Sequence, residues 1–315
     1  MLSSFSSAYR PEGSLIFTDE NRDLISSPDK LAKALAEGRI LEAPAIRCSN
    51  SLDLTVELGG CIGIIEKNEI AFEPDGSPVK DIAAITRVGK PVCFKVLSIE
   101  NNVARLSRRE AQREAYLNFL AGLTPGDIIP AKVTHLEHFG AFVDIGCGNV
   151  SLLPIDCISV SRISHPKDRL SVGTELMTVV RSIERNESGA PVRFFVSRKE
   201  LLGTWEENAS LFEVGQTVTG IVRSVETYGI FIELTPNLAG LAEFRDDVAP
   251  GQAAAVYIKS MLPDKMKVKL VIVDPYRGIP PKPIPHSFLP PDALHISRWK
   301  YSPDCCERLV ESVFD

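Results

Sequence analysis

The feature that most constrains this chain of 315 residues is a stretch of sequence that occurs three times. Residues 172–184 closely parallel residues 88–100, and residues 250–260 form a weaker third copy. Upstream of each copy, a glycine opens an alternation of apolar and polar residues, at Gly38, Gly126 and Gly215. Repetition at a nearly constant interval is typical of an array of similar domains. The chain is therefore expected to fold as three related units in tandem.

The pattern within one copy predicts what each unit is. The second copy contains five short runs typical of β-strands, separated by glycine and asparagine turns, at 129–134, 141–145, 150–154, 176–183 and 194–197. Five short strands in one small unit predict a closed antiparallel barrel of the OB type. The predicted fold class is mainly β, with three tandem OB-fold barrels joined by short helices.

Helical periodicity and a change in composition give the domain organisation. A capping-box spacing, Thr204 followed by Glu207, predicts a helical connector, and Ser27 before Pro28 predicts the start of an N-terminal helix. The tail is rich in proline, which the interior of a sheet does not accept, and Ser302-Pro303 predicts a last short helix that ends at Phe314. The predicted units are an N-terminal segment with a helix (1–37), a degenerate first barrel (38–108), a helical connector (109–123), a second barrel (124–203), a second connector (204–212), a third barrel (213–274) and the tail (275–315).

Charge and motif content exclude several function classes. The net charge of −6 excludes the uniform basic field of a chromatin protein. No apolar run is long enough for a signal peptide or a membrane span, so a cytoplasmic protein without a membrane partner is expected. The seven cysteines contain no C-x-x-C pair, and no phosphate loop, zinc motif or nucleophile elbow occurs. We therefore predict no enzyme, no metal and no cofactor.

The second copy contains the motifs that suggest a family. It reads His-Phe-Gly-Ala-Phe-Val-Asp-Ile-Gly over 138–146 and Arg-Phe-Phe-Val-Ser-Arg-Lys-Glu over 193–200. This copy resembles the S1 RNA-binding domain, which is named for the largest protein of the bacterial small ribosomal subunit, and the third copy is similar over 228–234. The whole chain resembles a short bacterial member of that family with three repeats. The resemblance implies OB barrels that bind single-stranded RNA such as mRNA in translation or mRNA handling, with the small ribosomal subunit or RNA-processing proteins as further partners.

The resemblance also implies where RNA would bind. Gly140, between Phe139 and Phe142, permits a bend that turns both rings to one outer face, where bases stack in the family. The alternative is that both rings belong to the barrel core. Basic residues and histidines near these rings complete the predicted site. The predicted RNA-binding residues are Lys132, His138, Phe139, Phe142, Arg162, His165, Lys167, Arg169, Arg193, Arg223, Tyr228, Phe231 and Lys267.

The first copy differs from the other two at these positions. Leu52 and Thr55 replace the two rings, and Val103 stands where Arg193 does in the second copy. The first barrel is therefore predicted to be a structural or protein-docking module. The runner-up function is a protein-protein docking module of a ribosome, RNA-decay or transcription complex, which the acidic total favours. Charge within the second copy balances, nine basic against nine acidic residues over 124–204, so the distribution of cations matters more than their number.

Overall fold

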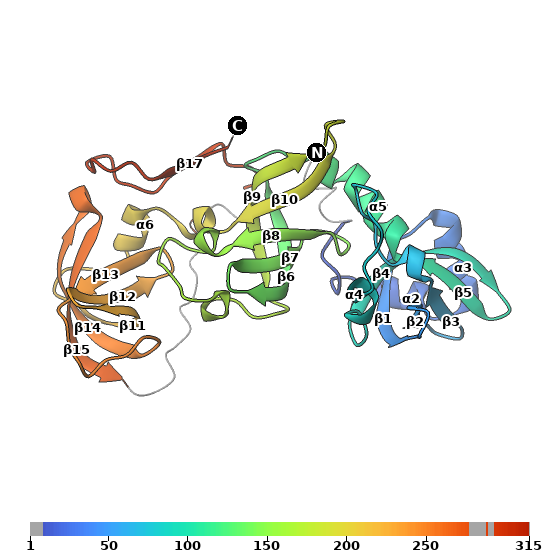
Figure 1. Ribbon diagram of the computed structural model, residues 1–315, viewed down its shortest axis with the longest axis horizontal. Coiled ribbons are helices and arrows are strands. Elements are labelled where there is room, and N and C mark those ends of the chain that lie inside the picture. The colour runs from blue at the N-terminus through green and yellow to red at the C-terminus, as the bar shows by residue number, and fades with distance from the viewer. Residues whose placement is uncertain (1–8, 277–287, 289–292, 315) are drawn as a thin grey trace.

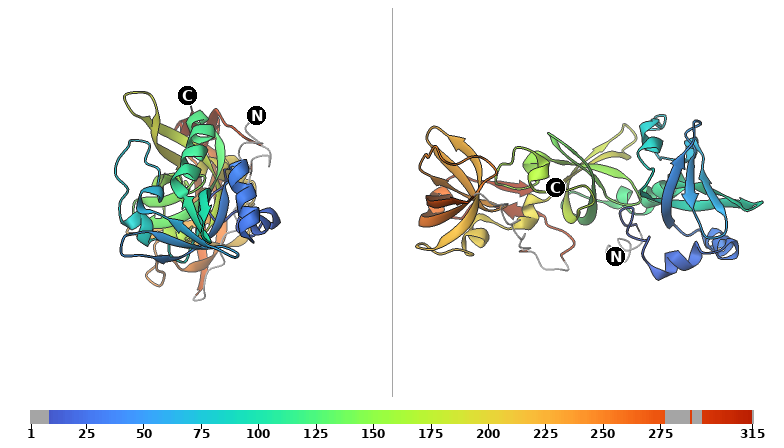
Figure 2. Two further views of the ribbon diagram at one scale, coloured as in Figure 1. Left: turned by 90° about the vertical axis from the view of Figure 1, so that its right-hand side faces the viewer. Right: turned by 90° about the horizontal axis from the view of Figure 1, so that it is seen from below.

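The computed structural model describes residues 9–276, 288 and 293–314, and it contains three closed five-stranded barrels that follow one another along the long axis (Figures 1 and 2). The predicted fold class is confirmed. The first barrel has the strand order β1-β2-β3-β5-β4. Its strands are β1 (Leu41–Cys48), β2 (Leu54–Glu57), β3 (Ile62–Ile65), β4 (Pro91–Glu100) and β5 (Val103–Ser107).

The central and third barrels repeat this topology, with a parallel pair closing each barrel between its third and fifth strands. The central barrel contains β6 (Ile128–Glu137), β7 (Gly140–Asp144), β8 (Val150–Pro154), β9 (Glu175–Arg185) and β10 (Pro191–Ser197). The third barrel contains β11 (Thr217–Glu226), β12 (Gly229–Thr235), β13 (Leu238–Ala242), β14 (Ala253–Leu262) and β15 (Lys267–Tyr276).

Strand alternation explains which side chains fill each barrel. On β7, Ala141 and Val143 are buried, whereas Phe142 between them is only half-buried. On β10, Phe194 and Val196 point inward in the same way. Successive side chains of a strand point to opposite faces, so each barrel has an aliphatic interior and an outer face whose residues the fold leaves free to vary.

Short helices connect and cover the barrels. The side chain of Ser27 caps the N-terminus of α3, which ends at Gly38 with a left-handed φ of 63°. Thr204 and Glu207 form the predicted capping box at the start of α6. The α-helices are α2 (Asp19–Leu24), α3 (Pro28–Glu37), α4 (Ile82–Ile85), α5 (Arg108–Asn118) and α6 (Trp205–Ala209). The 3₁₀ helices are η1 (Lys67–Glu69), η2 (Leu120–Gly122), η3 (Ile155–Cys157), η4 (Pro166–Asp168), η5 (Lys199–Leu202) and η6 (Pro263–Lys265).

The N-terminal segment joins the first barrel to the central one through buried charges. The Glu12 carboxylate accepts two hydrogen bonds from the Arg108 guanidinium, at 2.6 Å from Nε and 3.0 Å from Nη2, and one from Arg87 at 3.0 Å. Burial acts to raise the pKa of Glu12, but Arg108 and then Arg87 outweigh it and lower the pKa to about 2. The backbone N–H of Glu12 donates to Asp144 of the central barrel at 2.7 Å. This junction therefore holds the two barrels in one arrangement.

A second buried carboxyl in the first barrel anchors the same segment. Glu42 on β1 accepts the backbone N–H groups of Gly13, Leu15 and Ile16 on a single oxygen, Oε2, at 2.9 to 3.1 Å. Burial raises the pKa of Glu42 to about 7, and these hydrogen bonds offset only part of that shift. Within the described part of the chain, all three of these N–H groups bind Oε2, so the site accommodates a neutral glutamic acid that is protonated on Oε1.

The central and third barrels meet at a second buried cluster. Glu233 on β12 accepts hydrogen bonds from Arg169, which lies between β8 and β9, and from Arg223 on β11, whose Nε lies 2.6 Å from Oε2. Nearby, Asn237 donates from Nδ2 to the carbonyl oxygens of Lys199 and Gly203, both at 2.8 Å. Because both barrels contribute to this network, their relative position is fixed.

The tail does not contain the predicted short helix over 303–314. Residues 298–313 instead form a hairpin of β16 (Arg298–Lys300) and β17 (Glu311–Val313) that extends from the third barrel to the central one (Figure 1). Trp299 and Tyr301 pack on the third barrel and Phe314 on the central barrel. Only an extended chain is long enough to reach both apolar surfaces. Burial of the three rings therefore favours the hairpin over the helix that Ser302-Pro303 predicts. Within the described residues, no helix is long and apolar enough to cross a membrane.

Candidate nucleic-acid interface

A row of side chains crosses the outer face of the central barrel. The strand register places Phe142 on β7 beside His135 on β6 and Leu152 on β8, and Leu152 lies beside Phe195 on β10. His135 is exposed, and the other three are half-buried. The His135 ring lies nearly parallel to the Phe142 ring, with centroids 6.4 Å apart. The row is a continuous apolar strip flanked by a histidine.

Phe139 completes this face from the turn that precedes β7. Its side chain is 55% exposed, and its ring meets that of Phe142 edge to face, with centroids 6.0 Å apart. Gly140 makes the turn possible, because a Cβ there would lie 2.5 Å from the carbonyl oxygen of Leu153. Neither ring belongs to the buried core, so the core alternative is wrong. We call Phe139 and Phe142 the aromatic platform.

The third barrel carries an equivalent pair of rings. Tyr228 is 69% exposed, and its ring lies edge to face with that of Phe231, with centroids 6.1 Å apart. Phe231 on β12 is beside Leu241 on β13, which is beside Lys269 on β15. A cation thus occupies the position that Phe195 holds in the central barrel.

The first barrel has no ring at any of these positions. In its register, Thr55 takes the place of Phe142, with Arg47 and Ile64 on the neighbouring strands, and Arg105 follows Ile64. The row therefore consists of two β-branched side chains, Thr55 and Ile64, with an arginine at each end. A base can stack on an aromatic ring but gains far less from a threonine or an isoleucine, so this barrel lacks the stacking surface of the other two.

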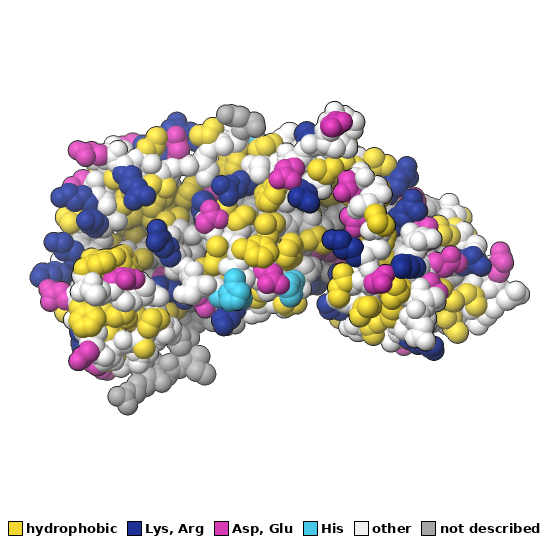
Figure 3. All heavy atoms as spheres, viewed as in Figure 1, with side chains coloured by type: hydrophobic (Ala, Val, Ile, Leu, Met, Phe, Trp, Pro, Cys, Tyr) yellow, Lys and Arg dark blue, Asp and Glu magenta, His cyan; other side chains and the backbone are white. Residues whose placement is uncertain are grey.

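Histidines and cations lie beside the aromatic platform. His138 and His165 meet edge to face, with ring centroids 4.8 Å apart. His165 Nδ1 accepts the backbone N–H of Lys167 at 3.0 Å, which caps the start of η4 and orients the His165 ring. On the face shown in Figure 3, the histidine side chains lie over the central barrel beside hydrophobic ones. Lys167 and Arg162 of this loop are exposed, and neither makes an ion pair with a described residue.

Two further predicted cations lie on the outer surface. Arg193 on β10 is exposed, with Nη1 3.7 Å from Oε2 of Glu184, and Lys267 on β15 is exposed as well. Exposed ion pairs at such a distance are weak. Both cations therefore remain available to a phosphate group.

Three predicted cations are engaged in contacts within the chain. Arg169 and Arg223 are held by Glu233 in the buried junction, where their side chains are 5% and 13% exposed. Lys132 donates to the carbonyl oxygen of Glu12 at 3.1 Å. These side chains satisfy acceptors within the protein and join parts of the chain, so they have less freedom to contact RNA than the exposed cations.

Sequence reasoning missed five members of the rows, which are His135, Leu152, Phe195, Leu241 and Lys269. Leu152, Phe195 and Lys269 all alternate with buried neighbours on their strands, which places them on the outer face. This alternation was a usable signal. What it could not supply is the register between strands, which aligns these residues in one row with Phe142 or with Phe231.

The comparisons with known proteins concern this same region. Residues 123–201 match the family model described as the S1 RNA binding domain. The chain is 30% identical over 195 residues to the small ribosomal subunit protein bS1 of Rickettsia conorii, a match that covers 59% of this chain and 32% of that protein. It is 29% identical over 202 residues to the protein of the same name from Staphylococcus aureus (strain COL), covering 58% and 50%.

The matched region spans only about a third of the first of these bS1 proteins and half of the second. A solved structure of a multidomain protein with nucleic acid binding domains, from Streptococcus pneumoniae, covers 75% of this chain at 16% identity with a TM-score of 0.23. That score is too low to compare how the barrels are arranged. The sequence matches identify the central barrel as similar to an S1 RNA-binding domain and the chain as similar to bS1 proteins.

Proposed function

We propose that this chain binds single-stranded RNA in the cytoplasm, through its central and third barrels, and that it acts in translation or mRNA handling. The observation that carries the proposal is the edge-to-face pair of the exposed Phe139 and the half-buried Phe142 in the barrel that matches the S1 RNA binding domain. A base that stacks on these rings removes apolar surface from water, which lowers the free energy of the complex. Each stacked base contributes about 1–3 kcal/mol and requires no particular sequence.

Backbone contacts would add to stacking. Arg162, Lys167 and Arg193 are exposed on the central barrel and its β8–β9 connection, and Lys267 is exposed on the third barrel. Each phosphate that such a cation neutralises releases counterions, so binding weakens as salt rises. Stacking and phosphate contacts together give binding that is weakly selective for sequence and sensitive to salt.

The rigid junction between the barrels supports a single strand that spans both ring pairs. Glu233, Arg169 and the Asn237 contacts fix the third barrel against the central one before RNA arrives. When an RNA strand binds the second ring pair after the first, no binding free energy is lost to fixing the two barrels relative to each other. Binding to an RNA long enough to reach both pairs should exceed binding to a shorter one.

A second candidate function is protein docking by the first barrel, with the small ribosomal subunit or an RNA-processing protein as partner. The supporting observation is a set of exposed aliphatic side chains on that barrel, which includes Ile46, Ile62, Ile82, Ile85 and Leu97. Exposed apolar surface of this kind is common at protein interfaces. This function is compatible with RNA binding by the other two barrels.

Fluorescence anisotropy of labelled oligo-U and mixed-sequence RNA, titrated with the intact chain at two salt concentrations, tests the proposal. The decisive variant is Phe139→Ala with Phe142→Ala, and the matched control is Leu52→Ala with Thr55→Ala at the same positions of the first barrel. We expect salt-dependent binding that falls in the first variant and not in the second. A folded protein that binds none of these RNAs would contradict the proposal and favour the docking function.

A further inference from the structure

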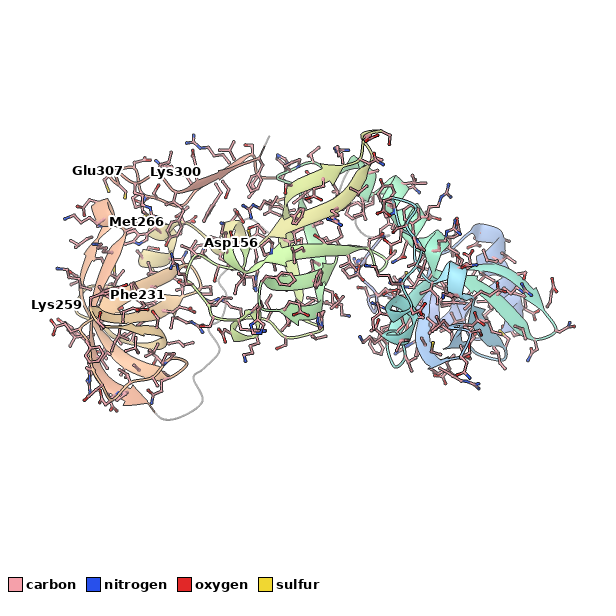
Figure 4. The ribbon with its side chains drawn as sticks, in the orientation of Figure 1. Asp156, Phe231, Lys259, Met266, Lys300 and Glu307 are labelled. Carbon is pink, nitrogen blue, oxygen red and sulfur yellow. The ribbon has the colours of Figure 1, made fainter. Side chains whose placement is uncertain are left out.

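Three of the chain's five histidines lie around the aromatic platform. The five are His135, His138, His165, His286 and His295. His135 on β6 lies beside Phe142, and His138 and His165 meet edge to face. The third barrel, on which Figure 4 labels Phe231, carries its ring pair without a histidine on any of its strands. A group of imidazoles therefore distinguishes the central platform from the ring pair of the third barrel.

The described histidines differ in what their ring nitrogens contact. His135 Nε2 lies 2.7 Å from Oε1 of Glu137, and His295 Nδ1 lies 2.9 Å from Oδ1 of Asp127. The side chain of His138 is exposed and makes no hydrogen bond or ion pair with any described residue. A carboxylate neutralises the positive charge that His135 or His295 gains on protonation. The charge that His138 gains has no such partner within the described part of the chain.

His165 is held in one tautomer beside His138. Its Nδ1 accepts the backbone N–H of Lys167 at 3.0 Å, which assigns the hydrogen of the neutral ring to Nε2. A second proton, on Nδ1, would remove this hydrogen bond, so His165 stays neutral more readily than His138 does. The centroids of the two rings are 4.8 Å apart. The pair thus combines one ring that is free to take up a charge with one neutral N–H donor.

We propose that His138 and His165 bind one phosphodiester of the RNA strand that stacks on Phe139, and that His138 takes up a proton when it does so. An imidazole gains its positive charge between about pH 8 and pH 5, and a nearby anion favours the charged form. The phosphate receives a charge-assisted hydrogen bond from His138 and a neutral one from His165 Nε2. His138 directly precedes Phe139 in the chain, so it lies beside the backbone of a nucleotide whose base covers that ring. The inference rests on the proposed function and adds a dependence on pH to it, in which RNA binding tightens as pH falls.

The other charges near the pair do not supply this dependence. The charged residues within four positions of either histidine are Glu137, Arg162, Lys167, Asp168 and Arg169. Glu137 contacts His135, Arg169 is bound by Glu233, and Oδ2 of Asp168 accepts two backbone N–H groups at 3.1 Å. The remaining two are exposed cations whose charge is constant over this range of pH. They raise the affinity for phosphate at every pH, whereas His138 raises it only when protonated.

Anisotropy titrations of a labelled oligo-U short enough to occupy only the central barrel, at pH 6 and pH 8 and constant ionic strength, test the site. Neither uracil nor the phosphodiester changes charge between these values. We expect binding to be about tenfold tighter at pH 6, because a charge-assisted hydrogen bond to the phosphate is gained. His138→Asn should reduce this ratio to less than twofold. Glu42 and Asp144 remain in the variant, so their titration at the other junction cancels in the comparison.

Two further variants complete the set. His135→Asn is the matched control and should leave the ratio between the two pH values unchanged, because Glu137 already neutralises the charge on His135. His165→Asn keeps an oxygen that accepts the Lys167 N–H and removes the Nε2 donor. Binding in His165→Asn should therefore weaken about threefold at both pH values, because one neutral hydrogen bond is lost.

Proton uptake is a second readout, which a merely structural role of His138 would not change. Calorimetry at pH 7 in two buffers of different ionisation enthalpy should show that up to one proton is taken up per bound strand, and none in His138→Asn. The same ratio between pH 6 and pH 8 in His138→Asn as in the original chain would overturn the proposal. So would a ratio that is lost in His135→Asn instead.

An abasic oligomer, the sugar–phosphate chain without its bases, separates this site from the proposed function. It should bind weakly at pH 6, more weakly in His138→Asn, and equally well in Phe139→Leu with Phe142→Leu. Binding of this oligomer through His138 by a chain that binds no oligo-U would support the phosphate site and contradict stacking. Binding of oligo-U without any dependence on pH would leave the proposed function standing and overturn the site. A folded chain that binds neither at pH 6 would contradict both.

Discussion

The first and central barrels share one topology and differ on one face. Both close five strands in the same order around an aliphatic interior. On the outer face, the central barrel presents Phe142 and Phe195 where the first presents Thr55 and Arg105. Inward residues are constrained by packing, whereas outward ones are not. The comparison teaches that the barrel is a scaffold and that a few outward side chains decide whether it can hold a base.

The two barrels also differ in their buried charges. The first barrel anchors the N-terminal segment with Glu42, a carboxyl whose pKa burial raises to about 7. In the central barrel, burial raises the pKa of Asp144 to about 6, and the nearby carboxylate of Glu12 adds to this shift. Glu42 of the first barrel binds the N-terminal segment, and Asp144 of the central barrel binds the same segment at Glu12. These contacts agree with a structural role for the first barrel.

The largest expected effect comes from removing the rings of the central barrel without removing apolar bulk. Phe139→Leu with Phe142→Leu should weaken oligo-U binding by thirtyfold or more, because two stacked bases each lose about 1–3 kcal/mol. Anisotropy titrations measure the loss. The converse change, which would add a ring to the first barrel by Leu52→Phe, is not suitable. Leu52 has a left-handed φ of 69°, and a bulky phenylalanine would be strained there. The comparison between the barrels would be broken if the leucine variant bound RNA as tightly as the original chain.

A second prediction concerns the stability of the first barrel as a function of pH. The pKa of Glu42 is higher in the folded chain than its ordinary value of 4.5, so the folded state binds the proton more tightly. Its contribution to the free energy of unfolding is therefore complete below about pH 4.5 and is lost as pH rises toward 7. The loss is on the order of 3 kcal/mol for a shift of this size.

Glu42→Gln should remove this dependence, because a neutral amide can place its oxygen where Oε2 accepts the three backbone N–H groups. Urea unfolding at pH 5 and pH 8, with the variant beside the original chain, measures the difference. We expect the variant to lose less stability than the original between the two values. An equal loss in both proteins would show that Glu42 is ionised in the folded state throughout this range.

The third prediction extends the comparison to the third barrel. Tyr228→Ala with Phe231→Ala should weaken binding of an RNA that spans both ring pairs by about tenfold, and should leave a short oligonucleotide that occupies only the central barrel unaffected. Tyr257→Ala is the control, because Tyr257 is an exposed ring on β14 of the same barrel, away from β12. Equal effects of the two variants would remove the third barrel from the RNA-binding surface.

The smallest expected effect is that of a single exposed cation. Arg193→Gln should weaken RNA binding about threefold at moderate salt and reduce the slope of log affinity against log salt by slightly less than 1. Arg105→Gln changes an exposed arginine on the corresponding strand of the first barrel and should alter neither quantity. Titrations at four salt concentrations give both slopes. The same slope in the Arg193 variant as in the original chain would exclude Arg193 from the phosphate contacts.

Much of this organisation could be predicted from the sequence, because repetition and alternation are local signals. The three barrels follow from the repeats and the period of two, and the position of Phe139 and Phe142 outside the core follows from the glycine bend. The hairpin of the tail could not be predicted, because it depends on the packing of Trp299, Tyr301 and Phe314 on barrel surfaces that are distant in the sequence.

The cations show the same limit at the candidate site. Arg162 and Arg169 lie in one loop and look alike in sequence, but only the structure reveals that Glu233 binds Arg169 and leaves Arg162 exposed. A carboxylate from the next barrel decides which cation is free. Arg169 and Glu233 are 64 positions apart in the chain, so a local sequence pattern cannot predict their contact.

Photo-crosslinking of oligo-U that contains 4-thiouridine, followed by mapping of the crosslinked peptides, tests the central claim most directly, since it reports which outer face RNA contacts in the unmodified chain. The account predicts crosslinks in the peptides that contain Phe139, Phe142 and Tyr228, and none on the row of Thr55, Ile64 and Arg105 in the first barrel. Crosslinks concentrated on the first barrel, or spread equally over all three, would contradict it.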